Sequence, residues 1–228
     1  MDTKRKNDLV PFLAKTALFR NISEEEIEEV LPLLKGRIIQ IAAESTFASG
    51  GEQIDRIQIV LKGELVVSKI LESGEENLIE KLGPGYMVNV AVACSSMKQN
   101  PFYVHSTKPT EIYEFSYNRL FREHVISDHV RSTLFQNIIY HLASDNIRRQ
   151  KKIDVLSVNG LRDRIIIYLE TRAQMLQSDS FTIPFNREEM ANYLCVNRSA
   201  LSHELSLMRQ EGIINFRKNR FTILRPQG

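Results

Sequence analysis

Four polar or basic side chains fall on neighbouring turns of one segment near the C-terminal end of the chain: Arg198, Ser199, Ser202 and His203. Residues three and four apart share a face of an α-helix, so a helix here would present these side chains together. An arginine can donate two parallel hydrogen bonds to a guanine, and serine or histidine can contact a base or a phosphate. If this helix is the second helix of a helix-turn-helix, its first turns enter the major groove, and these four residues are the candidates for reading bases of double-stranded DNA.

A second set of donors flanks this segment and suits the phosphate backbone of DNA. Its members are Arg187, Asn197, Arg217, Lys218 and Arg220. Contacts to phosphates fix the position of a protein on the duplex without reading its sequence. We predict that this set contacts phosphates.

The segment around these residues has the pattern of a winged helix-turn-helix. Asn186 with Glu189 and then Asn197 are N-cap residues, which predicts helices at 187–194 and 198–210 joined by a three-residue turn. Apolar residues supply a shared core, with a small residue at the helix contact: Met190, Ala191, Leu194, Val196, Leu201 and Leu205. Strands are expected at 181–185, 213–216 and 221–224, and another helix at 161–175. A plain helical hairpin with a basic turn is the alternative to this fold. The alternatives for single residues are an Arg198 that pairs with Glu204 or with a solvated neighbour, and a His203 that is merely exposed.

A long helix is expected before this region, because residues 126–153 contain no Gly or Pro. Its apolar stripe is wider than a surface helix needs. We predict that Leu134, Ile138 and Leu142 face a second subunit. The alternative is a helix buried within its own domain.

The N-terminal half changes from a helix to short strands. Ser23 and Glu26 form a capping box, which predicts a helix over 23–35. Residues 37–115 then alternate in short runs with turn signals every ten to twelve residues, as in an antiparallel barrel or sandwich.

Composition narrows the class of protein. Of 228 residues, 43% are hydrophobic and 25% charged, which argues against disorder, collagen or a disulfide scaffold. Cys94 and Cys195 match no zinc or iron–sulfur spacing, so no metal is expected. Lys15 interrupts the first apolar patch, and no run of 18 apolar residues occurs, so we expect no secretion signal, no membrane span and a cytoplasmic location. Residues 157–228 hold 10 Lys and Arg against 7 Asp and Glu, a net +3 that favours a polyanionic partner.

The segment from Leu194 to Ile214, LCVNRSALSHELSLMRQEGII, resembles the recognition-helix signature of the Crp/Fnr family of bacterial transcription regulators. Cys195 stands where Gly is usual and His203 where Arg is usual. The resemblance implies an α+β fold: an antiparallel β jelly-roll sensor domain at 1–127, a dimerisation helix at 128–156 and a winged helix-turn-helix domain at 157–228. It also implies a homodimer on inverted-repeat operators, with RNA polymerase as a further partner.

The family's cyclic-nucleotide residues are missing here. The matching stretch, 84–104, contains no Asp, Glu or Arg to bind a ribose or a cyclic phosphate, so cyclic AMP is not expected as the effector. No cofactor is expected either, although a haem would find single histidines at His105, His124, His129 and His141. The expected effector pocket takes a small neutral or weakly anionic organic ligand and is lined by polar residues of barrel and helix: Asn89, Lys98, Asn100, Tyr103, Asn137 and His141.

Two other functions compete with a ligand-controlled regulator. One is a DNA-binding protein that needs no effector and uses its barrel as a dimer scaffold. The other is a cupin-type barrel enzyme, which needs clustered His and carboxylate ligands, whereas residues 37–115 hold one histidine, His105. We therefore expect no enzyme and no catalytic residues.

Overall fold

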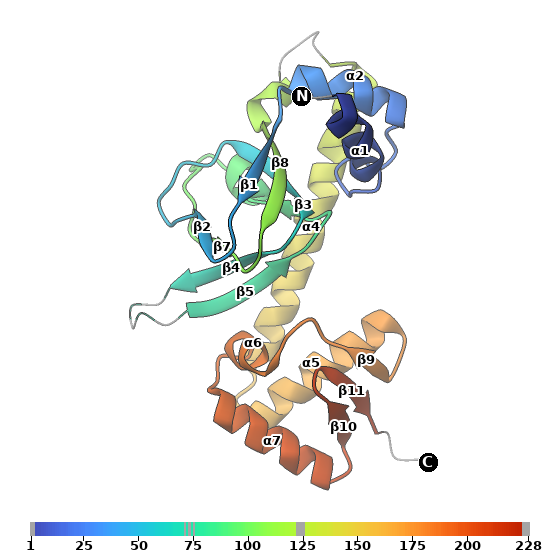
Figure 1. Ribbon diagram of the computed structural model, residues 1–228. Helices are drawn as coiled ribbons and strands as arrows, with labels where there is room; N and C mark the ends of the chain where they lie inside the picture. The colour runs from blue at the N-terminus through green and yellow to red at the C-terminus, as the bar shows by residue number, and fades with distance from the viewer. Residues whose placement is uncertain (1–2, 71, 73, 75, 122–125, 225–228) are drawn as a thin grey trace. The chain divides into compact units, whose positions relative to one another are not determined.

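The computed structural model describes residues 3–70, 72, 74, 76–121 and 126–224 (Figure 1). The chain forms two compact units, which divide within one long helix, α4 (Asp128–Ser157). The first unit contains residues 1–74 and 79–146, and the second contains residues 75–78 and 147–228. Each unit has buried apolar residues of its own.

Two helices begin the first unit. The capping box predicted at Ser23 and Glu26 is present and starts α2 (Glu24–Leu34), whose apolar side has Ile27 and Leu34 fully buried. The sequence pattern did not predict the preceding helix, α1 (Thr3–Ala14), which contains Pro11. This helix contacts α2 and buries Leu13 completely.

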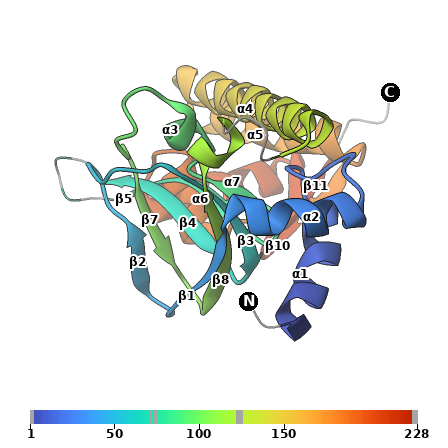
Figure 2. The same ribbon diagram turned by 90° about the horizontal axis from the view of Figure 1, so that it is seen from above.

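Two antiparallel sheets form the body of the first unit, as Figure 2 shows from above. One sheet has the order β1-β8-β3-β6 and the other the order β2-β7-β4-β5. The strands are β1 (Arg37–Ile41), β2 (Ser45–Ala48), β3 (Arg56–Lys62), β4 (Leu65–Ile70), β5 (Glu76–Leu82), β6 (Met87–Val88), β7 (Tyr103–Ser106) and β8 (Thr110–Ser116). A short helix α3 (Val90–Cys94) follows β6, and a 3-10 helix η1 (Tyr117–Phe121) follows β8. The antiparallel β architecture expected for this half is confirmed.

The turn from α2 into β1 requires a glycine. A Cβ atom at Gly36 would overlap the ring and the hydroxyl oxygen of Tyr113 in β8. Tyr113 is 1% exposed and has little room to move. Gly36 therefore lets the strand pass directly over the Tyr113 ring.

The first half of α4 belongs to the core of the first unit. Val130, Leu134 and Ile138 pack in the same apolar cluster as the strands, and Leu134 and Ile138 are 0% and 3% exposed. The predicted subunit contact must therefore be corrected for these two residues, because their side chains are already covered by their own chain. Leu142 is partly buried against the same cluster. The stripe is wide because α4 also carries apolar residues on its exposed side, where Ile139 and Tyr140 are 61% and 62% exposed.

The second unit has the predicted order of elements. It contains α5 (Leu161–Leu176), β9 (Ser180–Thr182), α6 (Arg187–Tyr193), α7 (Arg198–Gln210), β10 (Ile214–Arg217) and β11 (Arg220–Ile223). The three strands form one antiparallel sheet in the order β10-β11-β9. Met190, Leu201 and Leu205 are fully buried, as the helix-turn-helix pattern predicts.

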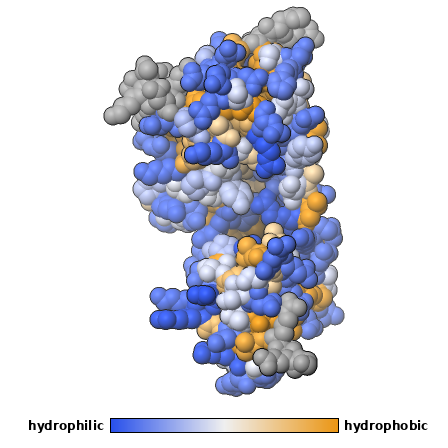
Figure 3. Space-filling model, turned by 90° about the vertical axis from the view of Figure 1, so that its right-hand side faces the viewer, coloured by the Kyte–Doolittle hydropathy of each residue, from blue (hydrophilic) through white to orange (hydrophobic). Residues whose placement is uncertain are grey.

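The surface is mixed in hydropathy. Figure 3 shows one face of the molecule, on which small hydrophobic patches lie among hydrophilic side chains. Nowhere in the part of the chain that the structure describes is a helix both long and apolar enough to span a membrane.

Candidate nucleic-acid interface

The connection between α6 and α7 is a tight turn of four residues, Leu194 to Asn197, one more than the sequence predicts because α6 ends at Tyr193. The amide of Val196 donates to the carbonyl of Ala191 at 3.0 Å, which closes the end of α6. Cys195 has a φ of 55°, a left-handed conformation that favours glycine. The turn thus keeps its backbone shape although cysteine stands at the position where the resembled family usually has Gly.

Asn197 fixes the start of α7. Its Oδ1 accepts from the amide of Ala200 at 2.8 Å and from the hydroxyl of Ser199 at 2.9 Å. An N-cap of this kind satisfies a free amide of the first turn and holds the helix in register. The capping role that the sequence indicates for Asn197 is confirmed, and the residue stays on the exposed surface.

The predicted base-reading residues lie on one exposed side of α7. The side chain of Arg198 is 66% exposed, Ser199 and His203 are exposed, and Ser202 is partly exposed. The opposite side of the helix, with Leu201, Leu205 and Met208, is buried. Ser206 continues the exposed side one turn further, and the same helical spacing could have identified it.

Of the two alternative pairings, Arg198 has the one with a solvated neighbour, Glu188, and not the one with Glu204, whose carboxylate binds Arg162. The Nε of Arg198 lies 3.8 Å from Oε2 of Glu188, and both side chains are more than half exposed. Such an exposed pair contributes little and is easily broken. Arg198 is therefore free to turn toward a ligand.

Glu204 pairs with Arg162 of α5. The Nε of Arg162 lies 2.6 Å from Glu204, and its two terminal nitrogens donate to the carboxylate of Glu211 at 2.6 and 2.8 Å. The hydrogen bonds from Arg162 lower the pKa of Glu211. The guanidinium of Arg162 thus joins α5 to Glu204 in the middle of α7 and to Glu211 directly after its end.

The β10–β11 hairpin carries the basic wing. Its turn consists of Lys218 and Asn219, and Lys218 has a φ of 56°. Arg217, Lys218 and Arg220 are all exposed. They place three positive charges on one hairpin tip.

Arg187 differs from the other predicted phosphate contacts. Its side chain is partly buried, and its Nη2 donates to the backbone carbonyl of Lys218 at 3.3 Å. Its guanidinium carbon lies 5.1 Å from the ring centre of Phe216 and 5.6 Å from that of Phe221. Burial lowers the pKa of Arg187.

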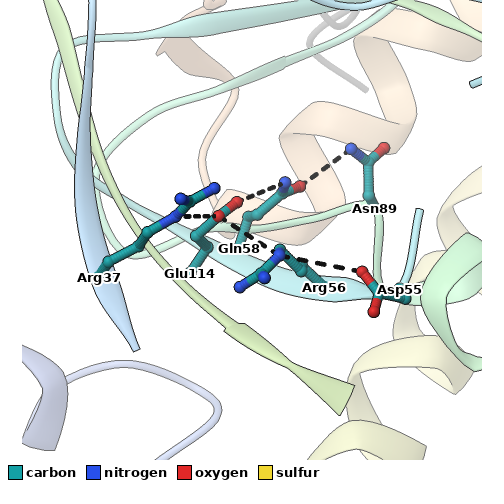
Figure 4. Close-up of polar contacts among 6 residues, drawn as sticks. All are labelled: Arg37, Asp55, Arg56, Gln58, Asn89 and Glu114. Atoms are coloured by element: carbon teal, nitrogen blue, oxygen red, sulfur yellow. Dashed lines mark hydrogen bonds and ion pairs between the residues drawn. The ribbon is translucent and has the colours of Figure 1, made fainter. Parts of the chain in front are cut away.

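In the first unit, a chain of polar side chains crosses one sheet and ends at Asn89 (Figure 4). Glu114, 2% exposed, lies in register opposite Gln58 and Arg37 of the neighbouring strands. Its carboxylate accepts from Nε of Arg37 at 2.8 Å and from Nε2 of Gln58 at 3.2 Å, and Nε of Arg56 lies at 3.5 Å. Because a carboxylate accepts only, the Gln58 amide turns its oxygen toward Asn89, whose Nδ2 donates to it at 3.0 Å.

Two other predicted effector residues are engaged by backbone carbonyls. The Nδ2 of Asn100 donates to the carbonyls of Ser49 and Phe102, and Asn100 is 1% exposed. The Nδ2 of Asn137 donates to the carbonyls of Leu18 and Arg20 at 2.8 Å each. These two amides stabilise loops and are not available to a ligand, so the expected lining must be corrected for Asn100 and Asn137.

Three further members of the predicted pocket are more accessible. The hydroxyl of Tyr103 lies 2.7 Å from that of Thr46, Nε2 of His141 lies 3.4 Å from Asp145, and Lys98 is partly exposed with a φ of 51°. These contacts join none of the three side chains to another, so each remains a separate candidate for binding an effector.

Metal-ligating groups are scattered. No group of three or more His, Cys, Asp or Glu side chains is placed to hold a metal ion within the described ranges. Cys94 and Cys195 are both free thiols, and burial raises the pKa of Cys94. His124 lies outside the described residues.

Two family models match the chain. The cyclic nucleotide-binding domain matches residues 38–124, and the Crp-like helix-turn-helix domain matches residues 163–228. The first match covers the two sheets, and the second covers the helix-turn-helix and wing.

Similar proteins span nearly the whole chain. A global nitrogen regulator of Synechococcus elongatus is 22% identical over 201 residues, which cover 86% of this chain and 88% of that protein. The structure of the c-di-GMP-responsive global regulator CLP of Xanthomonas campestris has a TM-score of 0.69 at 15% identity, covering 89% of this chain and all of that one. FixK2 from Bradyrhizobium japonicum has a TM-score of 0.60 at 15% identity, covering 84% and 94%. With both domains matched in this order, the chain belongs to the Crp/Fnr family of DNA-binding transcription regulators.

Proposed function

We propose that this regulator binds inverted-repeat DNA as a homodimer, with one α7 helix in the major groove of each half-site. The exposed side of α7 carries the proposal, because Arg198, Ser199, Ser202 and His203 lie together there. In helix-turn-helix proteins the first turns of the second helix reach base edges. The wing residues Arg217, Lys218 and Arg220, with Asn197 at the start of α7, then contact phosphates.

Gene regulation rather than catalysis is the role proposed for the whole chain. Its family consists of transcription regulators, and the net charge of +3 over residues 157–228 suits a polyanionic partner. Such a protein acts in the cytoplasm, where bacterial DNA is transcribed, and contacts RNA polymerase bound nearby.

The dimer contact is proposed for the exposed side of α4. Apolar side chains there are more than half exposed: Ile139, Tyr140, Ile147 and Ile153. Tyr140 and Ile147 are one heptad apart, and Ile139 and Ile153 are two heptads apart. A stripe with this period is covered when two helices pair as a coiled coil.

Sedimentation equilibrium tests this contact with two variants that each add one negative charge. Wild-type protein should have about twice the chain mass of 26.3 kDa. Ile139→Glu should sediment as a folded monomer, since it places an unpaired charge in the seam. Gln174→Glu adds the same charge to an exposed residue of α5, outside the stripe, and should remain a dimer. An unchanged Ile139→Glu dimer would place the contact elsewhere.

The response of the first unit is proposed not to involve cyclic AMP. Residues 84–104 supply no acidic group or arginine, and a cyclic phosphate there would have no cationic partner other than Lys98. Two alternatives are then a small effector other than cyclic AMP and a barrel that acts without a ligand. The hydrogen bonds of Asn100 and Asn137 to backbone carbonyls of their own chain favour the barrel without a ligand.

Calorimetry separates cyclic AMP from the other inputs. Millimolar cyclic AMP should give no heat and leave operator affinity unchanged. Micromolar binding that tightens DNA binding would contradict the proposal. Footprinting with and without a metabolite extract then distinguishes an effector-controlled regulator from an effector-independent one.

A further inference from the structure

The contacts of Arg187 are with Met190 of its own helix and with the wing of its own domain. Nη2 donates to the carbonyl of Lys218 at 3.3 Å, and Nη1 lies 3.8 Å from the sulfur of Met190. The guanidinium covers the rings of Phe216 and Phe221, one from each wing strand. A planar cation stacked on aromatic rings is held by attraction to their faces as well as by its hydrogen bonds.

The wing turn has two residues, and each is fastened to a different element. Asn219 bonds to the segment after β9: its carbonyl accepts from the amide of Ile183 at 2.9 Å, and its Nδ2 donates to the carbonyl of Ile183 at 3.2 Å. Lys218 is fastened through its carbonyl to Arg187 at the start of α6. Arg187 therefore links the tip of the wing to the helix-turn-helix.

This link matters because the turn carries the exposed cations. The sheet that holds the hairpin has only three short strands, and the turn of Lys218 and Asn219 lies beyond its last paired residues, so the tip depends on contacts with other segments. If the guanidinium turned outward to a phosphate, it would give up the carbonyl of Lys218 and its contacts with Phe216 and Phe221, while Arg209, 5.6 Å from the ring centre, would still lie over Phe216. The fork geometry can be supplied by arginine but not by lysine, whose ammonium neither stacks in the same way nor spreads its donors in a plane.

We propose that Arg187 is a positioning residue, which holds the wing against α6 so that Arg217, Lys218 and Arg220 reach DNA phosphates, and is not itself a phosphate contact. The inference rests on the proposed DNA-binding function. It replaces the sequence-based expectation that Arg187 contacts a phosphate.

The salt dependence of DNA binding distinguishes the two roles. The slope of log affinity against log salt becomes shallower by about 0.9 for each phosphate that the protein no longer neutralises. Arg220→Gln serves as the control that removes one wing cation, and it should reduce the slope by about that amount. Arg187→Lys keeps the charge but not the fork, and it should reduce the slope by about two to three times as much, because the wing cations are released together.

A wing-neutral background gives the decisive comparison. The triple variant carries Arg217→Gln, Lys218→Gln and Arg220→Gln. Adding Arg187→Gln to it should change neither the affinity nor the slope further, because Arg187 acts through the wing cations that the triple variant already lacks. A further reduction of about 0.9 in slope would make Arg187 a phosphate contact and overturn the proposal. So would an Arg187→Lys variant that binds as wild type does.

Amide hydrogen exchange, measured on the protein without DNA, tests the contact between Arg187 and the wing independently of DNA binding. The amide of Ile183 donates to the wing turn, so Arg187→Lys should speed its exchange while exchange at the buried Leu205 stays as in wild type. Unchanged exchange at Ile183 would overturn the inference even if DNA binding is established. If wild-type protein bound no DNA but Ile183 exchanged faster in the variant, the proposed function would fail and the wing contact would stand.

Discussion

Arg198 begins the exposed side of α7, and its guanidinium forms a 3.8 Å ion pair with Glu188. The pair breaks at little cost, since both groups are largely exposed to water. His203, one turn further on, is also exposed and stands where the resembled family usually has Arg. A histidine offers fewer donors than a guanidinium, so the half-site read by α7 should differ from the family's usual one at that base pair.

Replacing Arg198 tests whether it reads a base. Arg198→Ala should reduce the preference for the selected operator over random DNA by about 1–3 kcal/mol, the value of one bidentate contact. Arg198→Lys retains the charge without the fork and should reduce the preference nearly as much. Binding measured by fluorescence anisotropy on both duplexes decides this. Equal weakening on operator and random DNA would assign Arg198 to the phosphate backbone instead.

At the scale of elements, the α2–β1 junction shows how one small residue sets a chain path. Gly36 passes so close to Tyr113 that a methyl group has no space. Gly36→Ala should destabilise the first unit by about 1–3 kcal/mol through overpacking. The melting temperature should fall by about 2–4 °C for each kcal/mol.

Gly50→Ala is the matched control, because a Cβ there meets nothing within 4 Å and the backbone does not need a positive φ. Its melting temperature should stay near that of wild type. If Gly36→Ala and Gly50→Ala had the same melting temperature, the ring of Tyr113 would have to move aside without a loss of stability, and the overpacking argument would be wrong.

Elements with local boundary signals could be predicted from the sequence. The bounds of α7 were predicted correctly because Asn197 caps its start and Gly212, at a φ of 73°, follows its end. The side of α4 that faces the barrel could not be predicted, since its apolar stripe serves both the core and the exposed surface. The partners of Asn100 and Asn137 also could not be predicted, because an amide side chain gives no sequence signal of the distant carbonyl it binds.

At the scale of the whole molecule, α4 is a continuous helix that contributes residues to both units. Its first half is part of the core of the first unit, and Val155 near its end is 2% exposed. A change in the pairing of two α4 helices would therefore act on both units of each chain.

Selection from a random duplex library by the purified protein tests whether two α7 helices of a dimer read two DNA half-sites. We expect enrichment of an inverted repeat whose half-site centres lie about 34–36 Å apart, one turn of DNA, with affinity that falls as salt rises. Enrichment of no sequence, or of a single unpaired half-site by a protein that sediments as a dimer, would contradict it.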